Sequence, residues 1–320
     1  MVILIPIMND WESFAYLVKR IDDVLSSEGM HAHLIAIDDG SSAQPEKILT
    51  DFQAVKKLDI LRLRINIGHQ RAIAVGLAYC SKNLPGQTVV VMDGDGEDGP
   101  EDIPRLYKAM ESEHSEKVIF AARSRRVESI LFRFFYIIYK IAHWLLTSRR
   151  IQFGNFSIIP ANRVHQLAVA SELWNHYAAT VVKSRIPYAL VSTQRKERIA
   201  GQSKMNFVGL VIHGLSALSV FSDEVVTRIL MLSCSIMALC VLASVGVLGV
   251  TYFTALTIPG WVMYVIAFMG IVFLQMMTLC FISCFFILGM RKQAVFIPER
   301  DYIYFISGIE EYPCMKSQTS

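Results

Sequence analysis

Two long uncharged segments near the C-terminal end place the strongest constraint on how this chain can fold. Residues 229–253 and residues 258–290 contain no Asp, Glu, Lys or Arg. Each segment is longer than the roughly 20 apolar residues that a helix needs to cross the hydrocarbon core of a bilayer. Only the short uncharged segment 254–257 separates them. The sequence therefore predicts a hairpin of two transmembrane helices after a more polar domain.

Charges beside the two apolar segments predict how the hairpin is oriented. Arg228 precedes the first segment and Arg291-Lys292 follow the second, whereas the connection carries no charge. Basic residues tend to stay on the cytoplasmic side of a membrane. Residues 2–5 lack the basic region of a signal peptide and read as a strand. We therefore predict an integral membrane protein whose polar domain and both termini are cytoplasmic.

Composition and charge narrow the class of partner. The formal net charge of +3 is too small to indicate nucleic acid, so we predict no nucleic-acid partner. Basic residues instead bracket residues 130–147, whose apolar side chains recur at helical spacing. This pattern predicts a helix lying in the membrane interface, although a core helix of the polar domain would show the same spacing. The bracketing residues are Arg123, Arg125, Arg126, Arg133, Lys140, Arg149 and Arg150.

Strand and helix patterns alternate along the first 121 residues. Such alternation is typical of an α/β fold with a mostly parallel sheet and helices on both faces. No G-x-G-x-x-G follows the first predicted strand and no Walker A loop occurs, which argues against an ordinary dinucleotide or ATP site. The predicted strands are residues 2–7, 33–37, 59–63, 89–92 and 117–121, and the predicted helices are residues 11–25, 73–79 and 103–110.

Three of these strands end in polar, turn-forming residues, at positions 6–10, 38–42 and 93–95. In a doubly wound sheet the carboxyl ends of the strands converge on one crevice, where ligands bind. We therefore expect the three polar segments to lie close together.

The third segment is the most specific, because Asp93 and Asp95 follow a buried strand one residue apart. Carboxylates placed in this way suit Mg²⁺ or Mn²⁺, which complete their coordination with phosphate oxygens. An acidic turn in which Asp98 or Asp102 caps the next helix would have the same sequence. The residues alone leave both interpretations open.

Four motifs in order give the chain a resemblance to a known family. They are Ile5-Pro6 with Asn9-Asp10; Asp38-Asp39-Gly40-Ser41-Ser42; Asn66-Ile67-Gly68-His69-Gln70-Arg71-Ala72 with Gly76; and Asp93-Gly94-Asp95 with Asp98 and Pro100-Glu101. In this order and spacing the chain resembles the family 2 glycosyltransferases of GT-A fold. With the apolar hairpin it is more narrowly similar to the polyprenyl-phosphate glycosyltransferases, the bacterial relatives of dolichyl-phosphate mannose synthase. The likeness weakens after about Lys292.

The resemblance implies a nucleotide-sugar donor and a divalent metal. Pro6 and Asp38 or Asp39 would hold the base and ribose, and Asp93 and Asp95 would bind the diphosphate through Mg²⁺ or Mn²⁺. Residues 66–72 would shape the nucleotide pocket, although His69 in that motif reads as a structural histidine. The substrate-binding residues that we predict in this part of the chain are Pro6, Asn9, Asp38, Asp39, Asn66, Gly68, Arg71, Gly94 and Arg123.

A basic segment at residues 195–204 is similar to the family's Arg-x-x-Arg-x-x-Gly-x-Ser-Lys segment, which closes over the donor and acceptor phosphates. Arginine forks suit phosphate oxygens, and Gly201 would allow closure. The likeness implies substrate contacts from Arg195, Ser203 and Lys204 and a catalytic role for Arg198. A solvated basic loop would look the same.

Residues 152–157 depart from the family pattern. Gln152, Asn155 and Ser157 stand where charged residues are expected, so Gln152 cannot act as an anionic base. A lipid phosphate is already an anion and needs less help to attack a sugar than a hydroxyl group does. Glu97 and Asp98 are the nearby replacements for the missing acid. We therefore predict Gln152 as substrate-binding and, as catalytic residues, Asp93, Asp95, Asp98 and Arg198.

Together these patterns predict an inverting, metal-dependent transfer of a sugar from a UDP- or GDP-sugar to polyprenyl phosphate, such as undecaprenyl phosphate. The reaction would take place at the cytoplasmic face of a bacterial inner membrane. Two alternatives remain open: a lipid or glycan hydroxyl as acceptor, and an inactive membrane scaffold with the same fold.

The predicted organisation follows from these segments. Gln275, with Gly246, Gly249 and Gly270, indicates helix packing or a homo-oligomer contact. The C-terminal tail either adds an edge strand or stays loose. The predicted parts are the GT-A domain at 1–205, a juxtamembrane amphipathic helix at 206–224, transmembrane helices at 225–253 and 258–290, and a cytoplasmic tail at 291–320.

Overall fold

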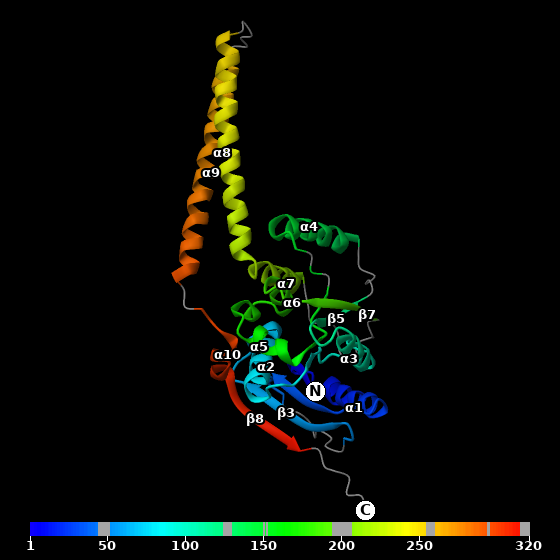
Figure 1. Cartoon of the computed structure of the whole chain (residues 1–320). Helices are drawn as coiled ribbons and strands as arrows, with labels where there is room; N and C mark the ends of the chain where they lie inside the picture. The colour runs from blue at the N-terminus through cyan, green and yellow to red at the C-terminus, as the bar shows by residue number, and fades with distance from the viewer. Residues whose placement is uncertain are drawn as a thin grey trace, which may run out of the picture. The chain divides into compact units, whose positions relative to one another are not determined.

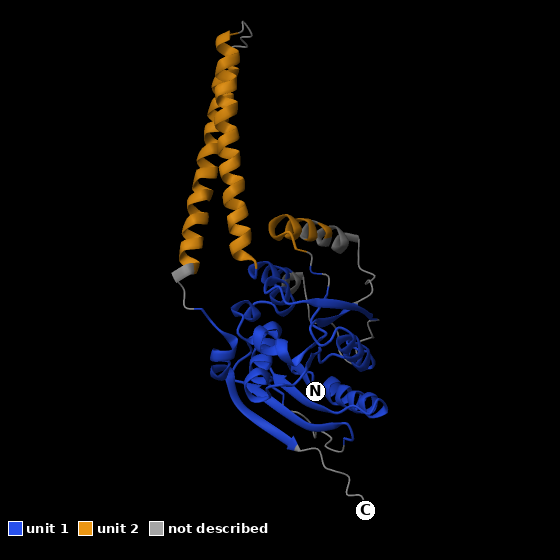
Figure 2. Ribbon diagram, viewed as in Figure 1, with its two compact units in different colours: residues 1–136, 150–220, 295–320 blue, residues 137–149, 221–294 orange. Residues whose placement is uncertain are grey.

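The computed structural model describes residues 1–43, 52–123, 130–149, 151, 153–193, 207–253, 260–292 and 295–313. The chain divides into two compact units, which are coloured separately in Figure 2. Unit 1 comprises residues 1–136, 150–220 and 295–320, and unit 2 comprises residues 137–149 and 221–294. The polar N-terminal part and the C-terminal segment therefore belong to the same unit.

Unit 1 is built on one mixed sheet, whose described strands number eight and run in the order β7-β5-β6-β4-β1-β2-β3-β8 (Figure 1). Strand β1 pairs in parallel with β2 and β4, as do β2 with β3 and β5 with β7. Strand β6 is antiparallel to β4 and β5, and β8 is antiparallel to β3. The strands are β1 (Val2–Ile7), β2 (Ala32–Asp38), β3 (Val55–Leu63), β4 (Val89–Val91), β5 (Val118–Arg123), β6 (Ser157–Ile159), β7 (Tyr188–Thr193) and β8 (Ile306–Pro313).

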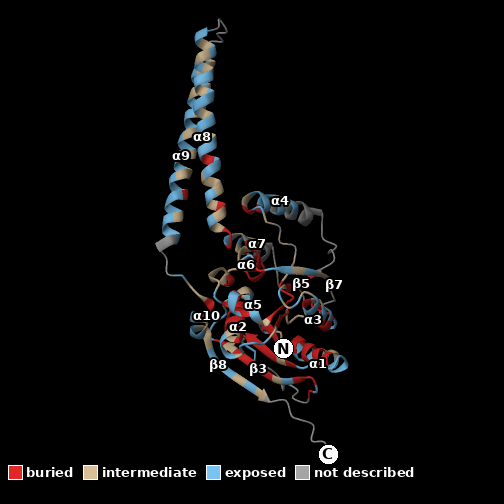
Figure 3. Cartoon of the chain, viewed as in Figure 1, coloured by how far each residue is buried: buried red, intermediate tan, exposed pale blue. Residues whose placement is uncertain are grey.

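Helices cover both faces of this sheet. Alternate residues of β1 point to opposite faces, so Ile3 and Ile5 pack with α1 (Trp11–Ser27) and α3 (Ile103–Ser112), while Val2 and Leu4 pack with α2 (His69–Asn83). Figure 3 shows the buried residues gathered along the strands and the inner helix faces. Helices α5 (Ala161–Ala168) and α6 (Tyr177–Lys183) and the 3-10 turns η1 (Pro100–Asp102) and η2 (Ser171–Trp174) complete this part of unit 1.

The central strands form because their sequences are continuous apolar runs, as expected for strands covered on both faces. In α1, Phe14, Leu17, Val18, Ile21 and Leu25 recur at helical spacing, and all five are fully buried. The alternating part of the predicted fold is therefore present, with elements at or near each predicted position.

Two strands beyond that pattern were not predicted. Strand β6 has only three residues and lies between β4 and β5 through antiparallel pairing, and β7 exposes every second residue at the sheet edge. A strand this short, or one half-covered by its neighbours, lacks the long apolar run by which a buried strand is recognised.

The C-terminal segment returns to the sheet. It forms α10 (Pro298–Asp301), the 3-10 turn η3 (Tyr302–Phe305) and β8, which pairs with β3 from Leu63↔Ile306 to Lys57↔Pro313. Ser81 Oγ donates a 2.7 Å hydrogen bond to Glu299 Oε1, which fixes α10 on α2. Of the two possibilities for the tail, the structure has the edge strand.

Unit 2 contains two long apolar helices, α8 (Ser222–Phe253) and α9 (Trp261–Lys292), which pack along each other as a hairpin. Residues 222–253 and 261–290 are long and apolar enough to cross a membrane, and 6% of the most apolar window of each is buried within the described structure. A core helix of a soluble domain would be mostly buried instead. Helix α4 (Ile130–Thr147) ends in unit 2, and α7 (Phe207–Ser219) belongs to unit 1.

Candidate active site

The turn after β4 is held by its own acidic side chains. The Asp93 amide donates a 2.9 Å hydrogen bond to Asp98 Oδ2, and the Glu97 amide donates a 3.0 Å bond to Asp95 Oδ1. Asp98 is 2% exposed. Its carboxylate therefore fixes the backbone that carries Asp93, while its predicted catalytic role stays a prediction.

Gly94 lets this turn pass close to the end of β1. A Cβ atom at Gly94 would lie 3.1 Å from the carbonyl oxygen of Pro6 and 3.2 Å from Ile5 Cγ2. A side chain here would push the two strand ends apart. Two predicted substrate-binding positions, Pro6 and Gly94, are thus brought together, as the parallel pairing of β1 with β4 requires.

The two aspartates that end β2 contact different parts of the structure. Asp38 Oδ1 accepts a 2.8 Å bond from the Ser41 amide, and Asp38 Oδ2 lies 2.9 Å from Arg62 Nη1. Asp39 accepts bonds from the amides of Ile67 at 2.7 Å and Gly68 at 2.9 Å. Asp39 therefore shapes the loop before α2.

Burial raises the pKa of Asp39 above its usual value, and the two amide donors oppose this shift. Carboxylate oxygens can accept more than one bond each. Both Asp38 and Asp39 therefore keep acceptor capacity for a ligand in addition to their present contacts.

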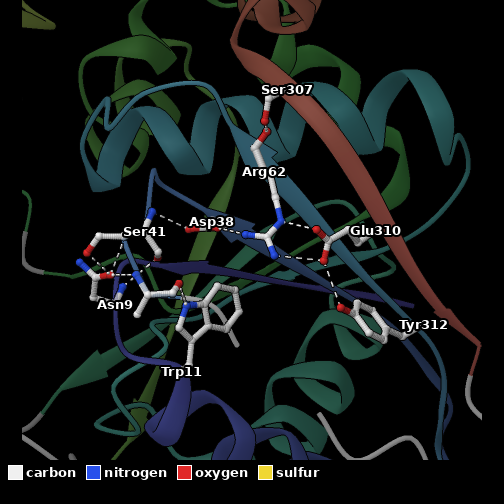
Figure 4. Close-up of polar contacts among 10 residues, drawn as sticks. Asn9, Trp11, Asp38, Ser41, Arg62, Ser307, Glu310 and Tyr312 are labelled. Atoms are coloured by element: carbon white, nitrogen blue, oxygen red, sulfur yellow. Dashed lines mark hydrogen bonds and ion pairs between the residues drawn. The ribbon is translucent and has the colours of Figure 1, made fainter. Parts of the chain in front are cut away.

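Asn9 ties the loop after β2 to the end of β1. The side-chain Oδ1 of Asn9 accepts hydrogen bonds from the backbone amides of Ser42 at 2.9 Å and Ala43 at 3.0 Å. The backbone amide of Asn9 donates to Ser41 Oγ at 2.9 Å (Figure 4). Asn9 has a φ of 55°, a left-handed conformation that asparagine adopts more readily than most residues. The indole Nε1 of Trp11 donates to the Ala43 carbonyl at 2.9 Å.

The loop before α2 meets the loop after β2. A Cβ atom at Gly40 would lie 2.7 Å from the backbone nitrogen of Asn66, so only glycine fits there. The side-chain amide nitrogen of Asn66, Nδ2, lies 2.9 Å from Met8 Sδ. Arg71 places its guanidinium 5.4 Å from the centroid of the Trp174 ring, a cation–π contact. The loops that carry Asn9, Asp38 and Asn66 therefore converge at one edge of the sheet.

His69, at the first position of α2, lies beside the acidic turn. Its Nε2 is 3.1 Å from Asp93 Oδ1 and 3.0 Å from Asn155 Nδ2. Desolvation lowers the pKa of His69, but the carboxylates of Asp93, Asp95 and Asp39 raise it by more, so the net direction is upward. The interpretation of His69 as a structural histidine stays a prediction, and the structure adds that it contacts Asp93.

A chain of polar contacts supports this histidine. The Tyr177 amide donates to Gln70 Oε1 at 2.8 Å, and Gln70 Nε2 donates to Asn155 Oδ1 at 3.1 Å. Asn155 is 8% exposed, and its Nδ2 lies 3.0 Å from His69 Nε2. One of the residues that departs from the expected acidic pattern is thus a link between α6, α2 and the acidic turn.

Comparison with known proteins decides the family. The model of a family described as "Glycosyl transferase family 2" matches residues 2–167, slightly more than half of the 320 residues. The chain belongs to glycosyl transferase family 2. The resemblance carried by the four sequence motifs is therefore confirmed.

One relative is an undecaprenyl-phosphate 4-deoxy-4-formamido-L-arabinose transferase from Klebsiella pneumoniae (strain 342). It is 27% identical over 130 residues, which are 40% of this chain and 38% of that protein. The match thus spans well under half of the relative's length. It therefore supports family 2 membership without transferring the relative's whole activity.

Among solved structures, a mannosyl-3-phosphoglycerate synthase from Rubrobacter xylanophilus is similar with a TM-score of 0.50. The two share 13% sequence identity, over 70% of this chain and 72% of that one. At this identity the likeness concerns the fold alone. It confirms the prediction of a GT-A sheet domain.

The acidic turn of this family 2 chain offers oxygen ligands for a divalent cation. Among the described residues, no three His, Cys, Asp or Glu side chains converge to hold a metal by themselves. Mg²⁺ commonly takes only one or two carboxylates and completes its shell with water and substrate phosphates. Asp93 and Asp95, separated by the single residue Gly94 on one turn, suit that type of site.

Several predicted site residues lie outside what the structure describes. Strand β5 ends at Arg123, whose side chain is not described. The others are Gln152, Arg195, Arg198, Ser203 and Lys204. Their predicted roles stay predictions.

Proposed function

We propose that this protein transfers a sugar from a UDP- or GDP-sugar to a polyprenyl phosphate, with inversion at the sugar C1 and with Mg²⁺ or Mn²⁺. The observation that carries the proposal is the convergence of the ends of β1, β2 and β4 in a family 2 chain. That edge presents Asp38, Asp39, Asp93 and the Gly94 turn together.

The reaction requires stabilisation of the charge on the leaving diphosphate and positioning of the donor and the acceptor. Asp93 and Asp95 would hold the cation, which, when bound, neutralises the charge that develops on the leaving diphosphate. The acceptor phosphate oxygen forms the new bond to C1 from the face opposite the leaving group, whose bonding pair departs with the nucleoside diphosphate. Asp38 and Asp39 would orient the nucleoside. The acceptor is already anionic, so the absence of an acid at Gln152 and Asn155 is compatible with this reaction.

The path of the chain supports a location at one face of a membrane. The helix pair α8–α9 is both preceded and followed by unit 1, because β8 pairs with β3. Two crossings return a chain to the side from which it started. Together with Arg228 and Arg291-Lys292, this supports a sheet domain and termini that are all cytoplasmic, at a bacterial inner membrane.

Exposed apolar side chains on two further helices support contact with that membrane. On α4, Ile137, Ile141, Trp144 and Leu145 are each between 46% and 59% exposed. On α7, Val211, Ile212 and Leu215 are each between 43% and 58% exposed. Apolar faces of this kind suit helices that lie in the interface plane. We propose this location for both helices.

A homo-oligomer remains part of the proposal. A Cβ atom at Gly246, Gly249 or Gly270 would meet nothing within 4 Å, so the packing of α8 on α9 does not require these glycines. Small residues that the hairpin itself does not need are compatible with the close approach of another helix.

A product assay tests the main proposal. Membranes containing the protein would be incubated with a labelled UDP- or GDP-sugar and undecaprenyl phosphate, with and without excess chelator. We expect a metal-dependent lipid product that releases its sugar in mild acid, because a sugar phosphodiester is labile. Undiminished transfer in excess chelator would contradict the metal requirement.

A second candidate uses the same donor chemistry with a lipid or glycan hydroxyl as acceptor. The observation that favours it is Asn155, whose amide is engaged by Gln70 and His69 where an acid was expected. A product that resists mild acid would identify this reaction. An inactive scaffold, in contrast, would bind neither UDP- nor GDP-sugars in calorimetry with metal present.

A further inference from the structure

The C-terminal strand contributes an acidic residue to the network behind the donor site. Arg62, on β3, lies between two carboxylates: Asp38 of β2 and Glu310 of β8 (Figure 4). Arg62 Nη1 is 2.9 Å from Asp38 Oδ2, and Arg62 Nη2 donates a 3.1 Å bond to Glu310 Oε2. Arg62 Nε also donates to Glu310 Oε1. Glu310 thus holds the guanidinium by two nitrogens.

The strand register places these three side chains on one face of the sheet. Arg62 lies opposite Asp38 in the β2–β3 pair, and Glu310 lies opposite Ile60 in the β3–β8 pair. Residues 60 and 62 point to the same face because side chains alternate along a strand. Glu310 is therefore a diagonal neighbour of Arg62, within reach of a long side chain.

Further contacts fix both ends of the pair. The Tyr312 hydroxyl donates to Glu310 Oε2 at 3.0 Å, and Ser307 Oγ donates to the Arg62 carbonyl at 3.0 Å. The hydrogen bond from Arg62 lowers the pKa of Glu310, so this carboxylate is ionised at neutral pH. The C-terminal strand thus holds both the backbone and the side chain of Arg62.

Burial makes this orientation matter for Asp38. Asp38 is 2% exposed, whereas the Arg62 side chain is 20% exposed and the Glu310 side chain 40% exposed. A buried carboxylate is stable only with a well-placed partner. Arginine presents its donors as a rigid fork, so fixing two of its nitrogens fixes the direction of the third. Asp38 also accepts from the Ser41 amide, which begins the loop held by Asn9.

We propose that Glu310 is a positioning residue for nucleotide binding: it holds Arg62 against Asp38 and thereby sets the orientation of that carboxylate and its loop. This inference rests on the proposed function, in which Asp38 contacts the nucleoside. It makes the segment after the membrane hairpin a part of the donor site. The chain must then complete both apolar helices before that site is fully formed.

Calorimetry with nucleoside diphosphates tests the proposal. The purified full-length protein in detergent would be titrated with UDP and with GDP in the presence of Mg²⁺, as the wild type, E310Q, E311Q and D38N. Glu311 is the matched control, because it is the neighbouring residue on the opposite face of β8 and pairs with Lys57 at 3.2 Å. For E310Q we expect the Kd to rise by on the order of tenfold. For E311Q we expect no change.

Steady-state kinetics supply a second readout. In E310Q the KM for the donor should rise with that Kd, while kcat and the KM for the lipid acceptor stay near wild-type values. General loosening of the domain would instead change all three. If E310Q does not fold, E310D takes its place, because its carboxylate is one methylene too short to hold both nitrogens. The same weakening is then expected.

The outcomes separate this inference from the function on which it rests. If the wild type binds neither diphosphate, the proposed donor site is wrong. If the wild type binds and D38N binds equally well, Asp38 takes no part in the site and the positioning role of Glu310 is overturned. If D38N binds weakly while a folded E310Q or E310D binds normally, the site stands and the positioning role of Glu310 is overturned. Equal weakening in E310Q and E311Q would overturn it as well.

Discussion

The carboxyl edge of the sheet and the middle of strand β3 both contain buried carboxylates, but these are held in different ways. At the edge, Asp38, Asp39 and Asp98 contact backbone amides of turns, and Asp93 and Asp95 lie on such a turn. In the middle, Asp59 on β3 contacts side chains only: His33 Nε2 at 2.8 Å and Lys57 Nζ at 3.0 Å. The carboxylates at the edge therefore hold loops, and Asp38 pairs with Arg62 as well, whereas the carboxylate of Asp59 contacts side chains alone.

This difference predicts a division of roles. Changes at the edge should affect binding and transfer more than stability, because the turns there face the site. Changes in the middle should affect stability more than activity. Within the described residues, Asp59 is fully buried and its Oδ1 has no hydrogen-bond partner, so its ion pairs are its main stabilisation.

The largest effect is expected for Asp95→Asn at the edge. Removing one anionic oxygen ligand should reduce metal-dependent transfer by about a thousandfold, since metal stabilisation of transition-state charge is worth several kcal/mol. The thermal unfolding midpoint should change little. Transfer assays and thermal melts on the same preparation check both parts. Full activity in this variant would contradict the interpretation of Asp95 as a metal ligand.

Asp59→Asn, in the middle of β3, is expected to lower stability and to leave activity unchanged. Losing the charge leaves His33 and Lys57 without their buried partner, which should lower the free energy of unfolding by about 2 kcal/mol after allowance for the half-exposed lysine. Transfer per folded molecule should stay near the wild-type rate. Glu311→Gln, on the exposed partner of Lys57, is the control and should cost much less. A large loss of specific activity in Asp59→Asn would break the proposed division.

Two glycines provide a smaller, matched comparison. A Cβ atom at Gly76, on α2, would lie 2.4 Å from Ile37 Cδ1 and 2.5 Å from Leu4 Cδ1 in the core. Gly76→Ala should therefore cost about 1–2 kcal/mol of stability through overpacking and leave donor binding unchanged. Gly94→Ala, beside the Pro6 carbonyl, should weaken donor binding severalfold with less effect on the melt. Thermal melts and nucleotide titrations of both variants make the comparison.

The smallest effect concerns acid pH. Burial raises the pKa of Asp59. The hydrogen bonds and charges of His33 and Lys57 together lower it by more, so the pKa in the folded state is below the usual value. The stabilisation is therefore complete above the unfolded-state pKa of about 3.9 and is lost as the pH falls through the lower folded-state value. The wild-type melting midpoint should fall towards that of Asp59→Asn below about pH 4. A constant difference between the two proteins down to pH 2 would contradict this linkage.

Much of the fold was predictable because its signals are local. Continuous apolar runs located β1, β2 and β4, and helical spacing located α1 and α3. Polar residues directly after those strands located the candidate site, because parallel strands bring their carboxyl ends to one edge. The two uncharged segments predicted α8 and α9 by length and composition alone.

The contacts that complete the site were not predictable, since they join residues far apart in sequence. His69 meets Asp93, and Asn155 meets Gln70, only because α2 packs against β1, β2 and β4 of the sheet. The roles of Gln152 and of the basic segment at 195–204 rest on the family resemblance alone.

Local sequence patterns predicted the family, the alternating sheet domain, the acidic turn at Asp93 and Asp95 and the apolar hairpin, because each depends on the order of nearby residues. Tertiary structure alone decided that the last strand lies beside β3 and that Glu310 holds Arg62 across 248 positions of sequence. Strand pairing at this separation depends on the register of the whole sheet, and no local pattern contains that register.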